Sequence, residues 1–111
     1  MTLRERQWLF MQNVAKLIAE IDRLGYTASF GETWRAPEQA AINAFRGTGI
    51  KNSLHTQRLA IDINLFKDGV FLTDGTGHKE LGQYWESLHP LNKNGRNFPK
   101  PDSNHYQMSD K

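Results

Sequence analysis

The sequence predicts a small α+β domain, and three observations lead to that class. Segments 2–24 and 79–88 carry apolar residues at three- and four-residue steps, which is typical of helices that bury one side. Segment 59–66 instead alternates apolar and polar residues, as half-buried strands do. Helices and strands follow one another without a repeated βαβ pattern. The length of 111 residues fits one domain, which we expect to comprise residues 1–111.

The first helix has a clear start and stop. Thr2 can cap it, Glu5 completes a capping box, and Gly25 follows its last turn. We expect an apolar stripe to face the core, made of Leu3, Phe10, Val14, Leu17, Ile18, Ile21 and Leu24. The residues that widen this stripe, and so indicate that more than one element covers the helix, are Trp8, Leu9 and Met11.

The next elements are shorter. We expect a strand at 26–30 and a second helix at about 38–45, with Pro37 in its first turn. The glycines that we expect to end this helix are Gly47 and Gly49.

Segment 59–66 predicts a half-buried strand with one acidic side chain, Asp62, in the middle of its polar side. Residues 70–72 are expected to pair back on this strand as a hairpin. The remaining elements are expected in the order helix, loop and final strand, at 79–88, 90–102 and 105–108.

Composition excludes several classes of protein. Because cysteine is absent, the chain can form no disulfide, thiolate metal ligand or cysteine nucleophile. The net charge of +2 is compatible with an anionic partner such as bacterial cell wall, but Lys and Arg are scattered, so nucleic-acid binding is not expected. No apolar run is long enough for a membrane span, and the charged opening 1–6 lacks the pattern of a secretory signal.

Three residues with metal-binding side chains form a candidate site. His55 stands just before the strand that carries Asp62, and His105 lies in the final strand. Imidazole and carboxylate are suitable zinc ligands, and catalytic zinc takes three protein ligands and leaves a fourth position for water. The seven-residue spacing from His55 to Asp62 would place the two on opposite sides of one continuous strand. The site therefore requires a turn or irregular segment at 56–58.

Asp102 stands three residues before His105. A carboxylate there could lie beside a metal-bound water without binding the metal, and act as a general base. From spacing alone, structural interpretations stay open. Asp62 could cap an element or pair with a basic neighbour, and Asp102 could belong to a turn that follows Pro101.

Three segments resemble, in the same order, the zinc D-Ala-D-Ala carboxypeptidase family, which includes VanY-like carboxypeptidases, VanX-like dipeptidases and phage L-alanyl-D-glutamate endolysins. Residues 53–62, SLHTQRLAID, resemble its Ser-x-His-x-x-Gly-x-Ala-x-Asp signature. Residues 102–106, DSNHY, resemble its second signature, an acidic residue three positions before a histidine that an aromatic residue follows. Residues 33–39, TWRAPEQ, are similar to its arginine-containing segment ahead of a helix.

The resemblance implies a fold with a short antiparallel sheet, about three flanking helices and a zinc site at the sheet. It implies zinc as the cofactor, with the ligands His55, Asp62 and His105. It also implies that Asp102 is the general base and that the hydroxyl of Ser53 lies by the substrate. Arg35 would bind the substrate or stabilise the developing oxyanion, for which its permanent charge and forked donors are suited.

Two positions depart from the family pattern. Arg58 occupies the position of the glycine in the first signature, so the turn made there must be reached differently. Gln107 follows Tyr106 where the family often has glutamate, which removes a charge close to the expected ligands.

The resemblance implies a zinc peptidase that acts on peptidoglycan stem peptides, of the phage or prophage endolysin type that cuts the L-Ala-D-Glu bond. The alternatives are a D-Ala-D-Ala carboxypeptidase or dipeptidase, and a non-catalytic zinc-containing module that binds cell wall or belongs to a virion tail. Asp102 favours an enzyme, since a binding module needs no base beside its metal. We expect a monomer without a membrane anchor, made in the bacterial cytoplasm without a signal peptide and released to the wall by another protein.

Overall fold

Helix α1 (Leu3–Arg23) begins at the predicted capping box. The computed structural model describes residues 1–47 and 53–109, and α1 is the longest helix among them. The Thr2 hydroxyl accepts a hydrogen bond from the Glu5 amide, and the Glu5 carboxylate accepts one from the Thr2 amide, each at 3.1 Å. Gly25 follows the last turn with a φ of +85°, a conformation that only glycine adopts readily.

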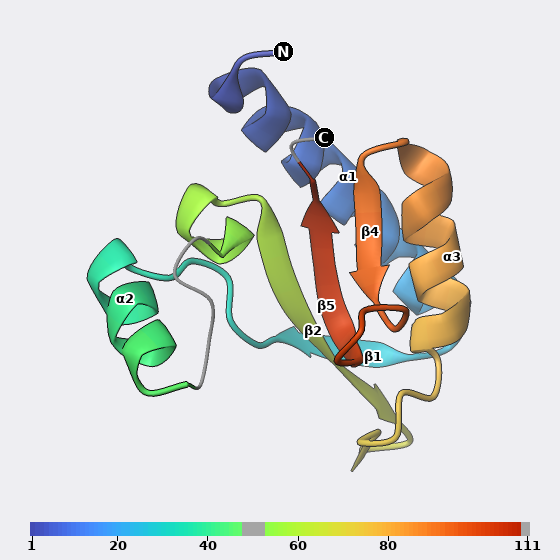
Figure 1. Cartoon of the computed structure of the whole chain (residues 1–111). Helices are drawn as coiled ribbons and strands as arrows, with labels where there is room; N and C mark the ends of the chain where they lie inside the picture. Colours follow the sequence, from blue (N-terminus) through green and yellow to red (C-terminus); the bar gives the residue numbers. More distant parts are fainter. Residues whose placement is uncertain (48–52, 110–111) are drawn as a thin grey trace.

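The side of α1 that faces the core is narrower than the sequence predicts. Its buried residues, which form one seam along the helix, are Phe10, Asn13, Leu17 and Ile21. Ile18 and Met11 lie about 90° around the helix from this seam and are exposed, as is Trp8. Leu3 is in line with the seam but lies at the end that projects past the sheet, where it is also exposed (Figure 1). The predicted widening of the stripe through Trp8 and Met11 is therefore wrong, whereas Leu9 packs against the core. As predicted, more than one element covers the helix, since α3, β1 and β5 all contact it.

In the described part of the chain, five strands form one antiparallel sheet, in the order β1-β2-β5-β4 with β3 paired to the end of β2 (Figure 1). Their bounds are β1 (Thr27–Phe30), β2 (Ala60–Lys67), β3 (Val70–Phe71), β4 (Asn92–Gly95) and β5 (Asp102–Met108). The predicted hairpin is present as the β2–β3 pair. With three α-helices around this sheet, the domain has the α+β architecture that the sequence predicts.

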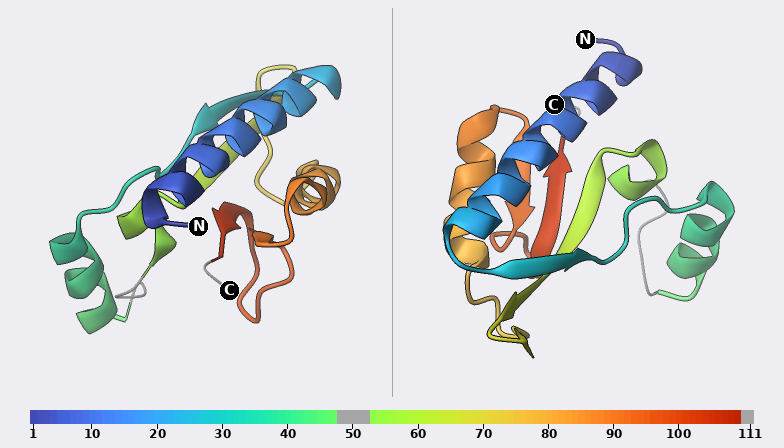
Figure 2. Two further views of the ribbon diagram at one scale, coloured as in Figure 1. Left: turned by 90° about the horizontal axis from the view of Figure 1, so that it is seen from above. Right: turned by 180° about the vertical axis from the view of Figure 1, so that it is seen from behind.

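The core lies between the sheet and two helices. Helix α1 crosses behind the sheet, and α3 (His78–Leu88) runs beside β4 (Figure 2). The Trp85 ring of α3 is fully buried and meets Phe10 of α1 and Tyr106 of β5 edge to face, with ring centroids 5.5 and 6.0 Å apart. The other side of β2 is left free of this core, and it carries Asp62.

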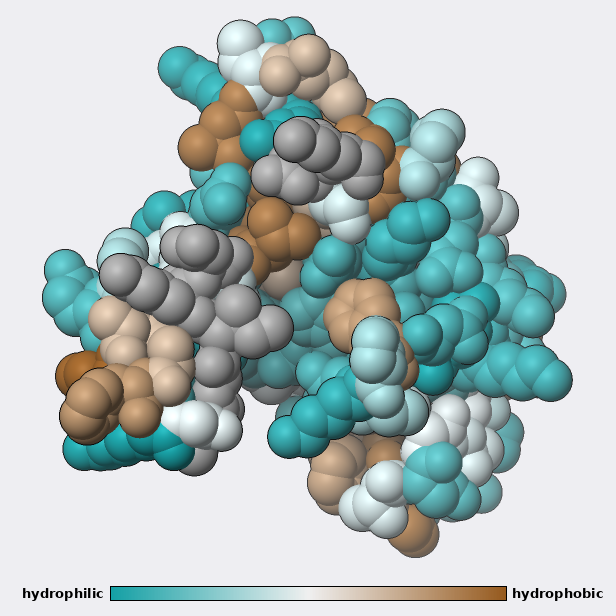
Figure 3. Space-filling model, viewed as in Figure 1, coloured by the Kyte–Doolittle hydropathy of each residue, from teal (hydrophilic) through white to brown (hydrophobic). Residues whose placement is uncertain are grey.

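Helix α2 (Pro37–Phe45) stands to one side of the sheet (Figure 1). Figure 3 shows apolar side chains over α2 and a mainly hydrophilic surface over α3 and β4; Ile42 and Phe45 are exposed. Gly47 follows the helix with a φ of +74°, as predicted, whereas Gly49 lies outside the described residues. None of the helices in residues 1–47 and 53–109 is long and apolar enough to cross a membrane.

The segment predicted as a loop at 90–102 contains a strand, β4, and this prediction is wrong. The sequence of β4, NKNG, has no alternation of apolar and polar residues that would predict a strand. Amide side chains hold this strand in place instead. Asn92 Nδ2 donates to the Trp85 carbonyl at 3.0 Å, and Asn94 Nδ2 donates to two carbonyls of β5 at 2.8 and 2.9 Å. Its partner β5 begins at Asp102, three residues before the predicted start.

Candidate metal centre

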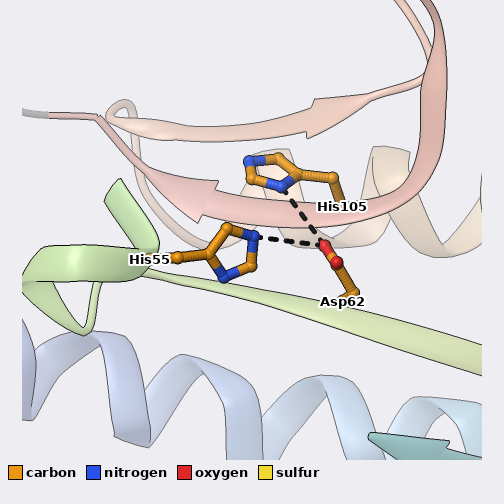
Figure 4. A group of neighbouring side chains, drawn as sticks. All are labelled: His55, Asp62 and His105. Carbon is orange, nitrogen blue, oxygen red and sulfur yellow. Dashed lines mark ion pairs between the residues drawn. The ribbon is translucent and has the colours of Figure 1, made fainter. Parts of the chain in front are cut away.

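Three side chains from distant parts of the chain meet on the free side of β2 (Figure 4). Asp62 Oδ1 lies 3.4 Å from His55 Nε2 and 3.3 Å from His105 Nδ1. The two imidazoles stand edge to face, with ring centroids 5.1 Å apart. All three ligand atoms lie within 4.8 Å of one another, and both histidines are buried. The structure thus brings together the three residues that the sequence picks out, in a group that could hold a metal ion.

Sheet pairing positions two of these residues. Asp62 of β2 lies directly opposite His105 of β5 in the antiparallel register. Tyr106, the next residue of β5, faces the core and is fully buried, as the alternation predicts. The pairing fixes the backbone under both ligands, so their separation depends on side-chain rotamers alone.

The third residue is positioned by a bend. His55 belongs to a short 3₁₀ helix, η1 (Leu54–Gln57), and Arg58 follows with φ 57° and ψ 35°, a left-handed conformation. This reverses the chain between His55 and Asp62, so the predicted irregular segment at 56–58 is confirmed. Arg58 reaches the conformation in which glycine is favoured, at a steric cost of about 1–2 kcal/mol. Its guanidinium lies 4.9 Å from the centre of the Trp34 ring.

Each imidazole has an inner nitrogen, which faces Asp62, and an outer nitrogen, which points away from it and lies near a hydrogen-bond acceptor. His55 Nδ1 lies 3.3 Å from the Thr33 carbonyl oxygen, and His105 Nε2 lies 2.7 Å from Gln107 Oε1. Gln107 Nε2 donates to Ser109 Oγ at 2.9 Å, which assigns the amide oxygen to the His105 side. Acceptors at the outer nitrogens place the ring protons there, so the lone pairs of the inner nitrogens point at Asp62.

A cation is needed between these groups. Asp62 Oδ1 is buried and has no hydrogen-bond partner within the described residues. Burial alone would raise the pKa of Asp62, but hydrogen bonds and positive charge from His105 and His55, with a proton on their inner nitrogens, outweigh it and hold the pKa at about 2. Burial is also the largest influence on His55 and lowers its pKa, yet Asp62, the Thr33 carbonyl and Glu32 together raise it above the ordinary value. Either an imidazole proton or a metal ion can balance the carboxylate.

The Arg35 side chain is linked to the metal-binding group through Glu32. A terminal nitrogen of its guanidinium donates to the Glu32 carboxylate, whose Oε1 is 3.7 Å from His55 Nδ1. The Arg35 amide donates to the His55 carbonyl at 3.2 Å. Glu32 is a local neighbour of Arg35, three residues away in sequence, but only the fold brings it to His55. The Arg35 Nε atom is buried without a partner in the described part of the chain.

The hydroxyl of Ser53 caps η1, accepting a hydrogen bond from the His55 amide at 3.2 Å. The Ser53 carbonyl accepts from the Thr56 hydroxyl at 2.6 Å. Ser53 therefore helps to hold His55 in position, and its contact with a substrate stays a prediction.

Asp102 is not part of the group of three. It is exposed at the start of β5, where it pairs with Gly95, and none of its interactions among the described residues reaches the ligands. The pairing shifts by three residues between Tyr106 and Asp102, so strict alternation does not decide which side Asp102 faces. The carboxylate lines a pocket that adjoins the centre. Its role as general base stays a prediction.

Comparison with known proteins supports the fold. The chain is similar to the crystal structure of the L-Ala D-Glu endopeptidase ChiX from Serratia marcescens, with a TM-score of 0.71 and 15% sequence identity. The likeness covers 88% of this chain and 79% of that chain. No family model matches the sequence. No curated protein matches it either.

Proposed function

We propose that this chain is a zinc peptidase that hydrolyses stem peptides of peptidoglycan. The observation that carries the proposal is the buried His55, Asp62 and His105 group, with its inner lone pairs converging and its outer nitrogens held by acceptors. The fold is similar to that of an enzyme named as an L-Ala D-Glu endopeptidase, and this likeness supports the proposal that the present chain cuts the same bond. We extend the proposal to an endolysin-type role in a phage or prophage, acting at the wall as a monomer.

The donor set fits zinc better than a hydrogen-bonded triad. Two ligands at zinc–nitrogen distances of 2.0–2.1 Å in a tetrahedron are about 3.3 Å apart. The two inner separations from Asp62 Oδ1 are 3.4 and 3.3 Å, longer than an ordinary N–H···O bond. Two imidazoles and one carboxylate without a thiolate are typical of catalytic zinc, which keeps an open position. When bound, zinc would polarise the scissile carbonyl and make water a nucleophile at neutral pH.

The chain's own residues would carry the remaining steps. Arg35 gives one guanidinium nitrogen to Glu32 and keeps further N–H donors for the carbonyl oxygen of the substrate, where charge develops. Asp102, exposed beside the pocket, would accept a proton from the attacking water and deliver it to the leaving amine. Gln107 and the Thr33 carbonyl would keep both imidazoles in the ligating tautomer.

The test is mass spectrometry of purified muropeptides after incubation with the zinc-loaded chain. We expect release of the peptide that begins with D-Glu, and its loss in His55→Ala. His89→Ala is a matched control, since His89 lies at the end of α3 and its Nδ1 accepts from the Leu91 amide. Release of D-Ala alone would replace the proposal with a carboxypeptidase. A folded, zinc-loaded chain that binds cell wall and cuts nothing would make it a binding module.

The general base is tested by Asp102→Asn, which keeps size and hydrogen bonding but cannot accept the proton. We expect turnover to fall by about 10²–10⁴-fold while zinc content and melting temperature stay unchanged. Loss of zinc in this variant would make Asp102 a ligand. Full activity would move the role of base to Glu32.

A further inference from the structure

A polar pocket of about 530 Å³ adjoins the metal centre. One of its walls is Asn64, which lies two residues beyond Asp62 on the same half-buried side of β2. A second wall is segment 102–104 of β5, which ends beside His105. Two residues of strand span about 7 Å, so the pocket begins one short step from Asp62.

The facing wall is held firmly in place. It consists of segment 71–75 and His78, the first residue of α3. A Cβ atom on Gly75 would come 3.0 Å from Ser103 Oγ, so this segment lies directly against β5. Asp74 also lines the pocket, and its Oδ1 accepts from the amide and the hydroxyl of Thr76 at 3.0 and 2.6 Å, which restrains the carboxylate.

His78 is a buried histidine of this pocket that the metal centre does not use. It is 3% exposed, and its Nδ1 lies 2.7 Å from the hydroxyl of the fully buried Tyr106. That hydroxyl has no other hydrogen-bond partner among the described residues, so it must donate to Nδ1 to be satisfied. Burial lowers the pKa of His78 to about 4, and the neutral ring then carries its proton on Nε2. Within residues 1–47 and 53–109, no acceptor pairs with this N–H group.

The lining of the pocket is acidic. Asp74 and Asp102 supply two carboxylates, and no lysine or arginine is among the described residues that line it. Such a lining attracts a cationic group. The N–H of His78 is suited to a neutral carbonyl oxygen. A peptide residue with a cationic side chain offers both groups.

We propose that this pocket is a substrate subsite that takes a residue with a primary ammonium side chain. In this subsite the ammonium group lies by Asp74, and His78 Nε2 donates to a carbonyl oxygen of the same residue. This inference rests on the proposed peptidase function. A step of about 7 Å along β2 is short enough that the pocket takes a residue close to the scissile bond, which here is the one joined to the γ-carboxyl of D-Glu. Asp74 and His78 then determine specificity, and Asp102 stands at the border between the pocket and the centre.

The test compares two peptides that the zinc-loaded chain cannot cut. Both contain L-Ala, D-Glu and L-Lys in this order, with the Ala–Glu amide reduced to an amine; the lysine side chain is free in one and acetylated in the other. We expect calorimetry to show at least tenfold tighter binding of the free lysine peptide. Asp74→Asn should reduce that preference to threefold or less. His78→Gln should weaken the binding of both peptides by a similar factor, about fivefold.

Asp68→Asn is the matched control, because Asp68 is an exposed carboxylate in the β2–β3 turn and does not line the pocket. It should keep the wild-type preference. Equal binding of the two peptides, or an unchanged preference in Asp74→Asn, would overturn the subsite. Hydrolysis of the unreduced peptides is measured separately. Cleavage without preference overturns the subsite alone, whereas preference without cleavage supports the subsite and overturns the peptidase.

Discussion

At the scale of single residues, the centre depends on groups that bind no metal themselves. Gln107 stands where a glutamate is common in the family that the sequence resembles, and its neutral oxygen lies 2.7 Å from His105 Nε2. Ser109 orients the amide, so the oxygen cannot turn away without losing a second hydrogen bond. The departure at this position therefore removes a charge but keeps the acceptor.

Gln107→Leu should weaken zinc binding by about 10–100-fold, because His105 loses the acceptor that fixes its tautomer. Gln107→Glu should bind zinc more tightly than the wild type, since a charged acceptor makes the ring more basic. Competition with a chromophoric chelator measures both. Gln83→Leu on the exposed side of α3 is the control and should have no effect. Equal affinities in the wild type and Gln107→Leu would show that the amide is not needed.

His78 should make the fold sensitive to acid. Burial lowers its pKa to about 4 from an ordinary value of 6.5, so between these values the unfolded chain binds a proton and the folded chain does not. The contribution of His78 to the free energy of unfolding is therefore fully present above pH 6.5. It falls as the pH drops toward 4, by about 1.4 kcal/mol per pH unit. His55, whose pKa is raised, has the opposite dependence, so we compare His78→Gln with the wild type by urea unfolding at each pH. A difference between the two that does not change with pH would contradict this role.

At the scale of elements, the sequence predicts those that follow a hydrophobic pattern and fails where polar groups form the structure. The capping box of α1 and the alternation of β2 are local signals, and both elements are found where they were expected. The strand β4 has no such signal, because Asn94 is buried by hydrogen bonds to two carbonyls of β5 and not by an apolar side chain. The contact of Glu32 with His55 has no local signal either, since the two residues are far apart in sequence.

The bend after η1 is an element that the site requires and that Arg58 supplies in a left-handed conformation. Arg58→Asn and Arg58→Val both remove the contact with Trp34, so their difference reports on the backbone alone. Asparagine tolerates this conformation and a β-branched residue does not. We expect Arg58→Val to be less stable than Arg58→Asn by about 1–2 kcal/mol in urea unfolding, and to bind zinc more weakly. Equal stability and affinity would show that the bend is set elsewhere.

At the scale of the whole molecule, the centre joins parts of the chain that are far apart in sequence. Asp62 and His105 are neighbours through sheet pairing, and His55 reaches them from η1, outside the sheet. Helix α2 and η1 lie to one side of the core that α1 and α3 form with the sheet (Figures 1 and 2). A metal ion held by all three ligands would tie this side of the molecule to the sheet.

Metal binding should therefore stabilise the whole fold, because the ligands come together only in the folded chain. With free zinc at 100 times its Kd, the expected gain is about 2.7 kcal/mol. For a domain of this size, each kcal/mol shifts the melting temperature by about 4 °C, so chelation should lower it by about 10 °C in calorimetry. His55→Ala, which lacks one ligand, should melt at nearly the same temperature with and without chelator. Metal analysis must first confirm that the chelator has removed the zinc. If the wild-type melting curve is then unchanged, the ion does not tie η1 to the sheet, and protein contacts alone hold His55 in position.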